Sequence, residues 1–311
     1  MNHSHWGNAS GIRKIFQAHE VLYHPSQYLI MKLISWNIRG LNCLGKYRLI
    51  KSMIQQEKPS IFFIQETKCN SVTLEKTMAK AWPGYNAISV DASGASGGLE
   101  IIWNAQTITL SNMHANKHFI QATFHITGTN IHGHLTNVYF PQEAMYKIEI
   151  LNNLSIINAK RTHPLWITVK DFNMITKLEE KRGGRSRLDK ESCHLKNFIQ
   201  NNKFFDIPFN NGVFTWNNKR VGPRQITSRL DRFLLSNNAI HLGRDLSASI
   251  LPLTGSDHWP IALQWTRPGN TARRPFHFEA FWLSHPDFNN FINMVWKSFI
   301  PLEGSKMFQF Q

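Results

Sequence analysis

The sequence predicts an α/β fold in which two stacked mixed sheets are flanked by helices. Short apolar runs typical of buried strands alternate along the chain with segments whose apolar residues recur at helical spacing. Some runs, such as 61–64, are apolar throughout, whereas others alternate apolar and polar residues, so the sheets should contain both fully buried and one-sided strands. With 311 residues and 42% hydrophobic residues, the chain can form one large domain with a sizeable core.

The individual elements follow from the same two patterns. We expect strands at 33–36, 61–64, 87–90, 99–103, 119–126, 134–138, 165–169, 213–216, 229–235, 249–251 and 260–264. We expect helices at about 46–57, 74–82, 145–157 and 187–201. The first of these helices ends at Pro59, because proline cannot continue a helix.

Composition divides the chain into four regions. Residues 1–30 lack a clear period, and we expect them to form a poorly ordered leader. Residues 31–266 carry the elements above and form the predicted domain. Residues 267–277 have the composition of a linker. Residues 278–311 begin with aromatic and apolar residues at helical spacing, so we expect the helical start of a truncated downstream region.

The charge of the chain favours nucleic acid as a partner. The formal net charge is +15 and the isoelectric point is about 9.9. Such an excess attracts polyanions, although a merely soluble basic protein is the alternative. No apolar run reaches the length of a membrane span, and the N-terminus lacks the apolar segment of a secretory signal. We therefore expect an intracellular protein without a membrane partner, and no obligate protein partner is evident.

Cysteine and histidine patterns argue against several kinds of site. Cys43, Cys69 and Cys193 lie far apart and form no CxxC pair, which disfavours a disulfide framework and a zinc site. The chain has 15 histidines but no HExxH motif. His132 and His134 lie in a strand-like stretch, where we expect surface or core filling.

Short polar clusters follow, or lie within, the predicted buried strands. They occur, in chain order, at 35–37, 65–67, 137–139, 171–173, 228–231 and 256–258. Clusters at so many strand ends predict a single catalytic rim above a packed sheet. Their Asn, Glu, Tyr, Asp and His side chains can bind a hard cation through oxygen, hold a phosphate and activate a water.

The carboxylates in these clusters suggest a metal site and an activated water. Glu66 follows a fully apolar strand, where it could bind Mg²⁺ or Mn²⁺ with support from Asn37, or pair with Lys68 as a solvated residue. Asp171 and Asn173 lie on one side of their strand, so together they could polarise a water and hold a phosphate oxygen. The alternative for that pair is an Asx turn that closes the strand.

A carboxylate and an imidazole form the second candidate pair. Asp231 lies in an apolar stretch, where a carboxylate is unfavourable unless it is paired, and His258 is its natural partner. Such a pair fixes the imidazole tautomer and favours the cationic form beside a phosphate. Asp257 can then face the metal, and Ser256 could simply cap the turn. Tyr139 can donate its hydroxyl to a phosphate, although a buried strand tyrosine is the ordinary alternative.

The ordered set of motifs resembles the endonuclease/exonuclease/phosphatase superfamily, and more narrowly the endonuclease domain of plant LINE-type non-LTR retrotransposons. The resemblance covers about residues 31–265. Its motifs are Ser-Trp-Asn-Ile-Arg-Gly-Leu-Asn, Gln-Glu-Thr-Lys, Ser-Gly-Gly-Leu, Asn-Val-Tyr-x-Pro, Asp-Phe-Asn, Ser-Arg-Leu-Asp-Arg-Phe-Leu and Ser-Asp-His-Trp-Pro-Ile. It implies a four-layered, DNase I-like α/β sandwich and Mg²⁺-dependent phosphodiester hydrolysis.

The resemblance also implies a role for each candidate residue. Glu66 would be the main metal ligand, assisted by Asn37 and Asp257. Asp171 would align or deprotonate the attacking water. The remaining residues would act on the phosphate: Asn173 and Tyr139 would hold it, and His258, oriented by Asp231, would stabilise the charge of the transition state. The product would be a DNA nick with a free 3′-hydroxyl, which primes reverse transcription in such elements, so the action would be nuclear.

The chain departs from the family pattern at one position, and two other functions compete with the one that the resemblance implies. The family usually has Gly before Asp-Phe-Asn, where this chain has Lys170. A lysine there could crowd the site or pair with Asp171 and impair activity, or it could point away and add a phosphate contact. The competing functions are a weakened remnant that still binds nucleic acid and a phosphoesterase for small or lipid substrates. Arginines that could follow a DNA backbone, or form a solvated loop, are Arg182, Arg185, Arg187, Arg220, Arg224 and Arg229.

Overall fold

The computed structural model describes residues 29–41, 44–94, 96–141, 143–236, 239, 245–252, 255–266 and 293. Contacts divide the chain into two units, Met1–Pro268 and Gly269–Gln311, and every described residue except Asn293 belongs to the first. The predicted linker lies outside the described residues, as do nearly all of the predicted leader and C-terminal helix. The predicted domain boundaries therefore stay predictions, although strand β1 already begins at Leu29.

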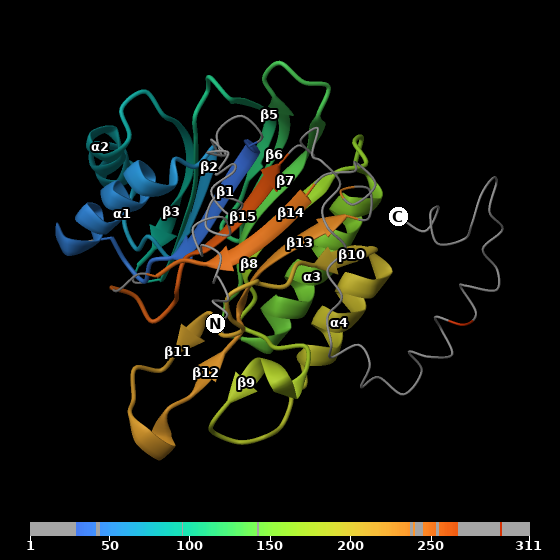
Figure 1. The fold of residues 1–311 in the computed structure, drawn as a ribbon. Coiled ribbons are helices and arrows are strands. Elements are labelled where there is room, and N and C mark those ends of the chain that lie inside the picture. The colour runs from blue at the N-terminus through green and yellow to red at the C-terminus, as the bar shows by residue number, and fades with distance from the viewer. Residues whose placement is uncertain are drawn as a thin grey trace, which may run out of the picture. The chain divides into compact units, whose positions relative to one another are not determined.

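Two six-stranded sheets form the centre of the first unit (Figure 1). The first sheet has the order β14 (Asp245–Ile250), β15 (Ile261–Thr266), β1 (Leu29–Asn37), β2 (Ile61–Gln65), β4 (Ser96–Trp103) and β3 (Asn86–Ser93). The second has the order β10 (Phe204–Asp206), β13 (Asp231–Ser236), β8 (Trp166–Asp171), β7 (His132–Tyr139), β6 (Phe119–Ile126) and β5 (Ile108–Ala115). Each sheet mixes parallel and antiparallel pairs, as predicted.

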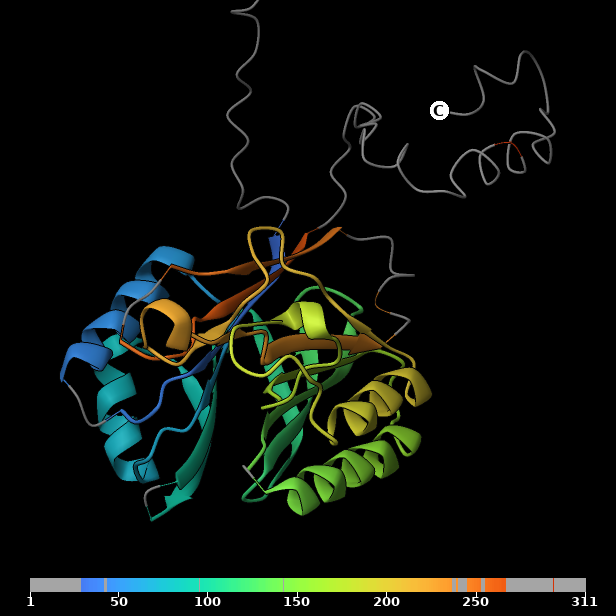
Figure 2. The same ribbon diagram turned by 90° about the horizontal axis from the view of Figure 1, so that it is seen from below.

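Helices cover the outer face of each sheet, so the unit has four layers (Figure 2). Helices α1 (Leu44–Glu57) and α2 (Ser71–Ala81) pack on the first sheet, and α3 (Ala144–Ala159) and α4 (Ser192–Asn201) pack on the second. Helix α2 begins where Asn70 Oδ1 accepts a hydrogen bond from Thr73 N at 2.9 Å, which satisfies one of the free N–H groups of its first turn. The predicted four-layered α/β sandwich is confirmed.

The core between the sheets explains why some strands are apolar throughout. Strand β2 is buried at every position: Phe63 faces the second sheet, whereas Phe62 and Ile64 face the helices. The edge strand β5 shows the opposite pattern, with only Ile108 and Leu110 buried. A strand of this polarity is invisible to a search for apolar runs, which is why the sequence did not predict it.

Several predicted elements are wrong in extent, among them the strand expected at 249–251, which is β14 (Asp245–Ile250). The helix expected at 187–201 begins only at Ser192, because residues 185–191 form turns in which Arg187 N bonds to Arg185 O and Ser192 N to Asp189 O. The strand expected at 213–216 is reduced to β11 (Trp216–Asn217). With β12 (Thr227–Ser228) and β9 (Lys181–Arg182), this strand forms a small third sheet.

Strands end together at one edge of the sandwich. Asn37, the last residue of β1, pairs with Gln65, the last residue of β2. In the second sheet Asp171 at the end of β8 pairs with Tyr139 on one side and with Asp231 on the other. Within the described part of the chain, no helix is long and apolar enough to span a membrane.

Candidate active site

Asn37 connects the two sheets at this edge. Its Nδ2 donates to Glu66 Oε1 at 3.0 Å and to Asp171 Oδ2 at 2.9 Å. Its Oδ1 accepts from Arg39 N at 3.1 Å. All three polar side chains are buried, so the amide fixes two carboxylates from different sheets in one place. The predicted meeting of the strand-end residues is therefore observed for this group.

Glu66 is a buried carboxylate surrounded by cations. It is 4% exposed, and its Oε2 lies 3.5 Å from an Arg39 terminal nitrogen and 3.7 Å from Lys68 Nζ. The pairing with Lys68 is present, but Glu66 is not the solvated residue that this alternative assumed. Arg39 Nε lies 3.2 Å from Asp257 Oδ1, so one guanidinium spans two carboxylates.

Four residues around the buried carboxylates have an uncommon backbone conformation. Arg39, Glu66, Lys68 and Asn173 all have left-handed φ, between 46° and 52°. Such residues are unfavourable by about 1–3 kcal/mol each and persist only where the surrounding structure fixes them. Their grouping around the buried carboxylates marks this edge as a built site.

Gly98, in the Ser-Gly-Gly-Leu motif, allows the Glu66 loop to approach β4. Its φ is +89°, and a Cβ atom there would lie 2.1 Å from Thr67 Oγ1. Thr67 N and Lys68 N bond to the carbonyls of Gly98 and Gly97. Any larger residue at 98 would push away the loop that carries Glu66.

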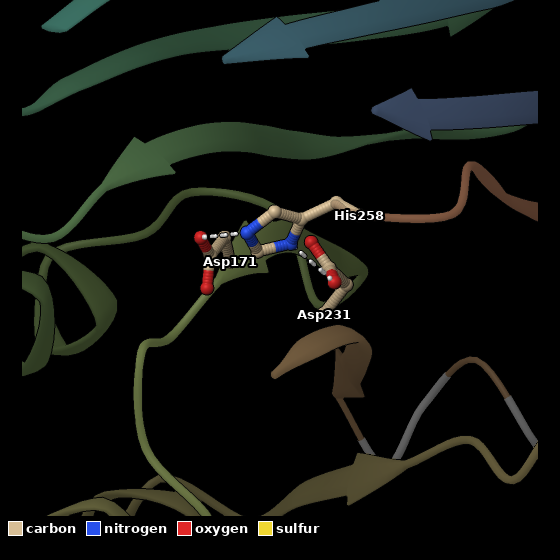
Figure 3. A group of neighbouring side chains, drawn as sticks. All are labelled: Asp171, Asp231 and His258. Atoms are coloured by element: carbon tan, nitrogen blue, oxygen red, sulfur yellow. Dashed lines mark hydrogen bonds and ion pairs between the residues drawn. The ribbon is translucent and has the colours of Figure 1, made fainter. Parts of the chain in front are cut away.

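His258 lies between two carboxylates (Figure 3). Its Nδ1 is 3.0 Å from Asp231 Oδ2, and its Nε2 is 3.5 Å from Asp171 Oδ2. Burial by itself would lower the pKa of His258, but the carboxylates of Asp231 and Asp171 outweigh it and raise that pKa to about 9. The ring is therefore cationic at neutral pH, and its Nε2 has no hydrogen-bond partner among the described residues.

Ser256 orders the turn that presents this histidine. Its Oγ donates to Asn37 O at 2.9 Å and accepts from His258 N at 3.2 Å. Trp36 Nε1 also donates to His258 O, at 3.1 Å. The expected capping role of Ser256 agrees with these contacts.

The Asp-Phe-Asn segment forms the Asx turn that was the alternative prediction, and it leaves one Asp171 oxygen facing the site. Asp171 Oδ1 accepts from Asn173 N at 2.9 Å, which is the Asx turn, while Oδ2 faces Asn37 and His258. Phe172 is buried in the core on the side of the helices, as alternation requires. Asn173 Nδ2 donates to Phe140 O at 3.1 Å, which fixes the direction of that side chain.

Tyr139 lies beside the same carboxylates. Burial, together with the charges of Glu66 and Asp171, raises the pKa of its hydroxyl. The hydroxyl therefore stays protonated at neutral pH and can donate to an anion. Its ring lies 3.9 Å from the position that a Cβ on Gly97 would take, an ordinary van der Waals contact.

Asp257 faces the site from the turn before β15, and the third sheet supports it. Trp216 Nε1 donates to its Oδ2 at 2.9 Å. Burial would raise the pKa of Asp257, but His258, this hydrogen bond and Arg39 lower it, so the carboxylate is ionised. Sequence reasoning missed Arg39 and Trp216 as parts of the site; Arg39 lies within the Ser-Trp-Asn-Ile-Arg motif, and Trp216 carried no signal beyond its strand.

Lys147 is a further residue that sequence reasoning missed. It is a buried lysine of α3, and its Nζ donates to Asn173 O at 3.2 Å. The contact supports the turn that carries Asp171. Its only signal in the sequence was a lysine among the apolar residues of a helix.

Lys170 lies in the interior of β8. Its backbone is paired on both sides, with Arg232 and with Val138. A paired position in a regular strand needs no left-handed φ, so the chain does not use the conformational freedom of glycine there. The orientation of the lysine side chain lies outside the described structure, so both predicted outcomes for Lys170 stay predictions.

Two groups of residues could be considered for a metal. Asp171, Asp231 and His258 have ligand atoms within 4.8 Å of one another. This group does not fit, because a metal-binding imidazole must be neutral and His258 is held cationic. Glu66, Asp257 and Asn37 fit a hard ion better, since they offer carboxylate and amide oxygens and a guanidinium already lies between the two carboxylates.

The comparisons with known proteins agree with this geometry. The model of the Endonuclease/Exonuclease/phosphatase family matches residues 34–258. The chain belongs to this family. Recombination repair protein 1 of Drosophila melanogaster is 31% identical over 111 residues, which are 36% of this chain and only 16% of that protein's length. The family resemblance predicted from the motifs is confirmed.

Solved structures of other proteins share the fold. The 3′-5′ exonuclease NExo of Neisseria meningitidis superposes with a TM-score of 0.61 at 17% identity, over 76% of this chain and 99% of that one. The endonuclease domain of TRAS1, a telomere-specific non-LTR retrotransposon, gives a TM-score of 0.57 at 14% identity, over 76% and 98% of the two chains. The DNase I-like architecture is therefore shown, and the chain is expected to be a hydrolase of this family.

Proposed function

We propose that this protein is a metal-dependent DNA endonuclease that cuts one strand and leaves a 3′-hydroxyl. The observation that supports this best is the cationic His258. Its Nε2 lacks a hydrogen-bond partner among the described residues and lies 3.5 Å from Asp171 Oδ2. Asn37 donates to this carboxylate and to that of Glu66. A buried N–H donor beside carboxylates suits an anion that binds together with a metal cation. A phosphodiester together with Mg²⁺ or Mn²⁺ meets this description.

The metal would be held by Glu66, with Asn37 and Asp257 assisting. Mg²⁺ or Mn²⁺ bound there would neutralise a phosphate oxygen and stabilise the leaving oxygen. Arg39, which now spans Glu66 and Asp257, would turn outward toward the DNA backbone. Its side chain is 32% exposed, so part of it already faces solvent.

Asp171 would activate the water. Its two oxygens are fixed by Asn173 N and by Asn37 Nδ2, so the carboxylate keeps one orientation. The water oxygen bonds to phosphorus, its proton passes to Asp171, and the bond from phosphorus to O3′ breaks. The products are a 5′-phosphate and an O3′ that takes up a proton to become the 3′-hydroxyl.

The remaining residues would bind the phosphate. His258 would donate from Nε2 to a phosphoryl oxygen while Asp231 holds its Nδ1–H, which keeps the ring oriented and cationic. The Tyr139 hydroxyl would donate to a second oxygen, since its raised pKa keeps it protonated. Asn173, whose Nδ2 is already bonded to Phe140 O, would contribute through the position of its turn.

The exposed basic residues around the third sheet support DNA as the substrate. Arg182, Arg185, Arg187, Arg220 and Arg224 are all exposed. The hairpin between β11 and β12 is tied to the site at its base, where Trp216 bridges His258. Arg229 is the exception and does not fit a DNA contact, because it is buried in ion pairs with Asp206 and Glu180.

The direct test is nicking of supercoiled plasmid in Mg²⁺ and in EDTA. We expect nicking that needs both Mg²⁺ and Glu66, so that Glu66→Ala removes it while Lys76→Ala, on the exposed face of α2, does not. Absence of nicking by the folded protein, with DNA binding that weakens steeply as salt rises, would support the weakened remnant instead.

A second arm separates DNA from small substrates. We expect Arg220→Ala with Arg224→Ala to weaken nicking several-fold and to leave hydrolysis of bis(p-nitrophenyl) phosphate unchanged, because that diester cannot reach the hairpin. Lys76→Ala with Lys80→Ala is the matched control for lost charge. Turnover of a soluble phosphomonoester without dependence on salt would support the phosphatase branch of the family. With chromosomal DNA as the substrate, the action would be nuclear.

A further inference from the structure

Four histidines form a continuous row at the end of the second sheet that lies away from the candidate active site. The ring centroids of His125 and His132 are 4.5 Å apart, those of His132 and His163 are 5.8 Å apart, and those of His163 and His134 are 5.4 Å apart. They come from the end of β6, the start of β7 and the loop before β8. Strand β7 runs from His132 to Tyr139, so the row lies about 20 Å from the catalytic residues.

Hydrogen bonds fix the tautomers of two of these rings. His125 Nε2 is 2.7 Å from Thr129 O, and since a carbonyl oxygen only accepts, Nε2 carries the hydrogen and Nδ1 keeps its lone pair. Histidines that bind metals are held in this way, with the other ring nitrogen donating to a carbonyl or carboxylate. In contrast, His134 Nε2 accepts from Thr162 N and His163 N, each at 3.3 Å.

His134 therefore acts as a positioning residue. It is buried, and burial together with the charges of His163 and Arg161 lowers its pKa, so it stays neutral and keeps accepting. Its backbone N also donates to Leu165 O at 2.8 Å. These bonds hold the loop that carries His163 against β7, close to His132.

We propose that His125, His132 and His163 bind a first-row transition-metal ion such as Zn²⁺ or Cu²⁺, at a site separate from the catalytic centre. Imidazoles are ligands that these ions prefer, whereas Mg²⁺ prefers oxygen. The rings are stacked, so closing on an ion requires rotation of the side chains. His132 is exposed and His163 only half-buried, and exposed side chains rotate within nanoseconds. The ion would link the β6–β7 hairpin to the loop before β8.

The test is a Zn²⁺ titration of the full chain by calorimetry, after removal of metals and in millimolar Mg²⁺ to occupy the oxygen site. His132→Ala removes the central ring, and His194→Ala removes an exposed histidine of α4 as the matched control. We expect His132→Ala to lose one equivalent of Zn²⁺, or about tenfold or more in affinity, while His194→Ala binds as the wild type does. Equal stoichiometry and affinity in all three proteins would overturn the proposal.

Thermal unfolding gives a second readout that does not depend on nicking. We expect Zn²⁺ to raise the unfolding temperature of the wild type and of His194→Ala more than that of His132→Ala, because a ligand stabilises only the state that binds it. His163→Ala should behave as His132→Ala does, and all variants should nick DNA as the wild type does in Mg²⁺. If neither variant lowers the Zn²⁺ effect, the proposal is wrong and the row is only a stack of rings.

Discussion

The two faces of β13 carry buried charges with opposite purposes. Asp231 and Arg232 are consecutive, so their side chains lie on opposite faces of one strand. Asp231 faces the other sheet and holds His258, whereas Arg232 faces the helices and binds Glu180 and Asp206. Both side chains are buried, yet only the Arg232 cluster is balanced in charge.

Charge balance distinguishes the two clusters. Beside Arg232, two guanidiniums meet two carboxylates, and although burial would raise the pKa of Glu180, the bonds from Arg232 lower it to about 2. Beside Asp231, a single imidazolium is shared between two carboxylates, so the charges do not balance. A buried cluster with balanced charges serves the fold, whereas one with unbalanced charges can bind a further charged group.

The largest expected effect breaks the unbalanced cluster. Asp171→Asn keeps the size of the side chain but removes the proposed base, so we expect the nicking rate to fall by about 10³–10⁴-fold. Single-turnover nicking in Mg²⁺ measures this. Unfolding by denaturant should show a loss of about 1–3 kcal/mol, because Asp171 accepts through both oxygens and Asn has only one acceptor oxygen, so the rate is compared per folded molecule. A fall of less than tenfold would mean that Asp171 is not the base.

The next effect breaks the balanced cluster. Arg232→Met leaves Glu180 and Asp206 with Arg229 alone, and an unpaired buried charge is unfavourable by about 3–5 kcal/mol. Urea unfolding should show this loss, while nicking per folded molecule stays near the wild-type rate. Arg220→Met is the control, since an exposed arginine should change stability by only about 0.5 kcal/mol. Equal stability of the two variants would contradict the comparison.

Asp231→Asn tests the pH dependence of the site. The carboxylate helps to hold the pKa of His258 near 9, so wild-type nicking should be constant up to about pH 8 and fall as the ring loses its proton near pH 9. Without that charge the pKa of His258 falls, so the alkaline decline moves to lower pH and the rate at pH 7.5 drops by about 10²-fold. A pH–rate profile whose alkaline limb does not move would exclude this role for Asp231.

Glu100 is a buried carboxylate that belongs to neither cluster. Burial raises its pKa to about 8, and Ser89 Oγ is the hydrogen-bond partner found among the described residues. Its folded pKa exceeds its unfolded pKa, so ionisation destabilises the fold increasingly from about pH 4.5 to pH 8. We expect Glu100→Gln to be more stable than the wild type by on the order of 2 kcal/mol at pH 8 and equal at pH 4. A constant difference would show that ionisation is not the cause.

The sequence predicted the fold wherever burial was continuous. The run 61–64 is apolar because β2 is buried on both faces, and that signal is local. The start of α4 was wrong because the spacing of residues 187–191 suits a helix, whereas backbone bonds to Asp189 and Arg185 close turns there instead. Strand β5 was missed because an edge strand pairs through its backbone and needs few apolar side chains.

The site was predictable as a set of residue types but not as a geometry. Strand-end placement brought Asn37, Glu66 and Asp171 together. Strands β1, β2 and β8 end at the same edge of the sandwich, however far apart they lie in the sequence. Trp216 and Lys147 could not be found in this way, because each reaches the site from outside the two sheets and by a single hydrogen bond. Such bonds depend on the packing of distant segments, which no local pattern encodes.

The smallest expected effect concerns Lys170, which precedes Asp171 in β8 and pairs with Arg232 of β13. The backbone there is regular strand, so Lys170→Gly should change nicking per folded molecule by less than about twofold and lower stability by about 0.5–1 kcal/mol through lost strand propensity. Lys170→Ala separates the two possible causes of a larger change. A several-fold rise in the nicking rate of both variants would mean that the lysine side chain impairs the site. A rise with glycine alone would assign the effect to the backbone. We do not expect that result, because position 170 is paired within a regular strand.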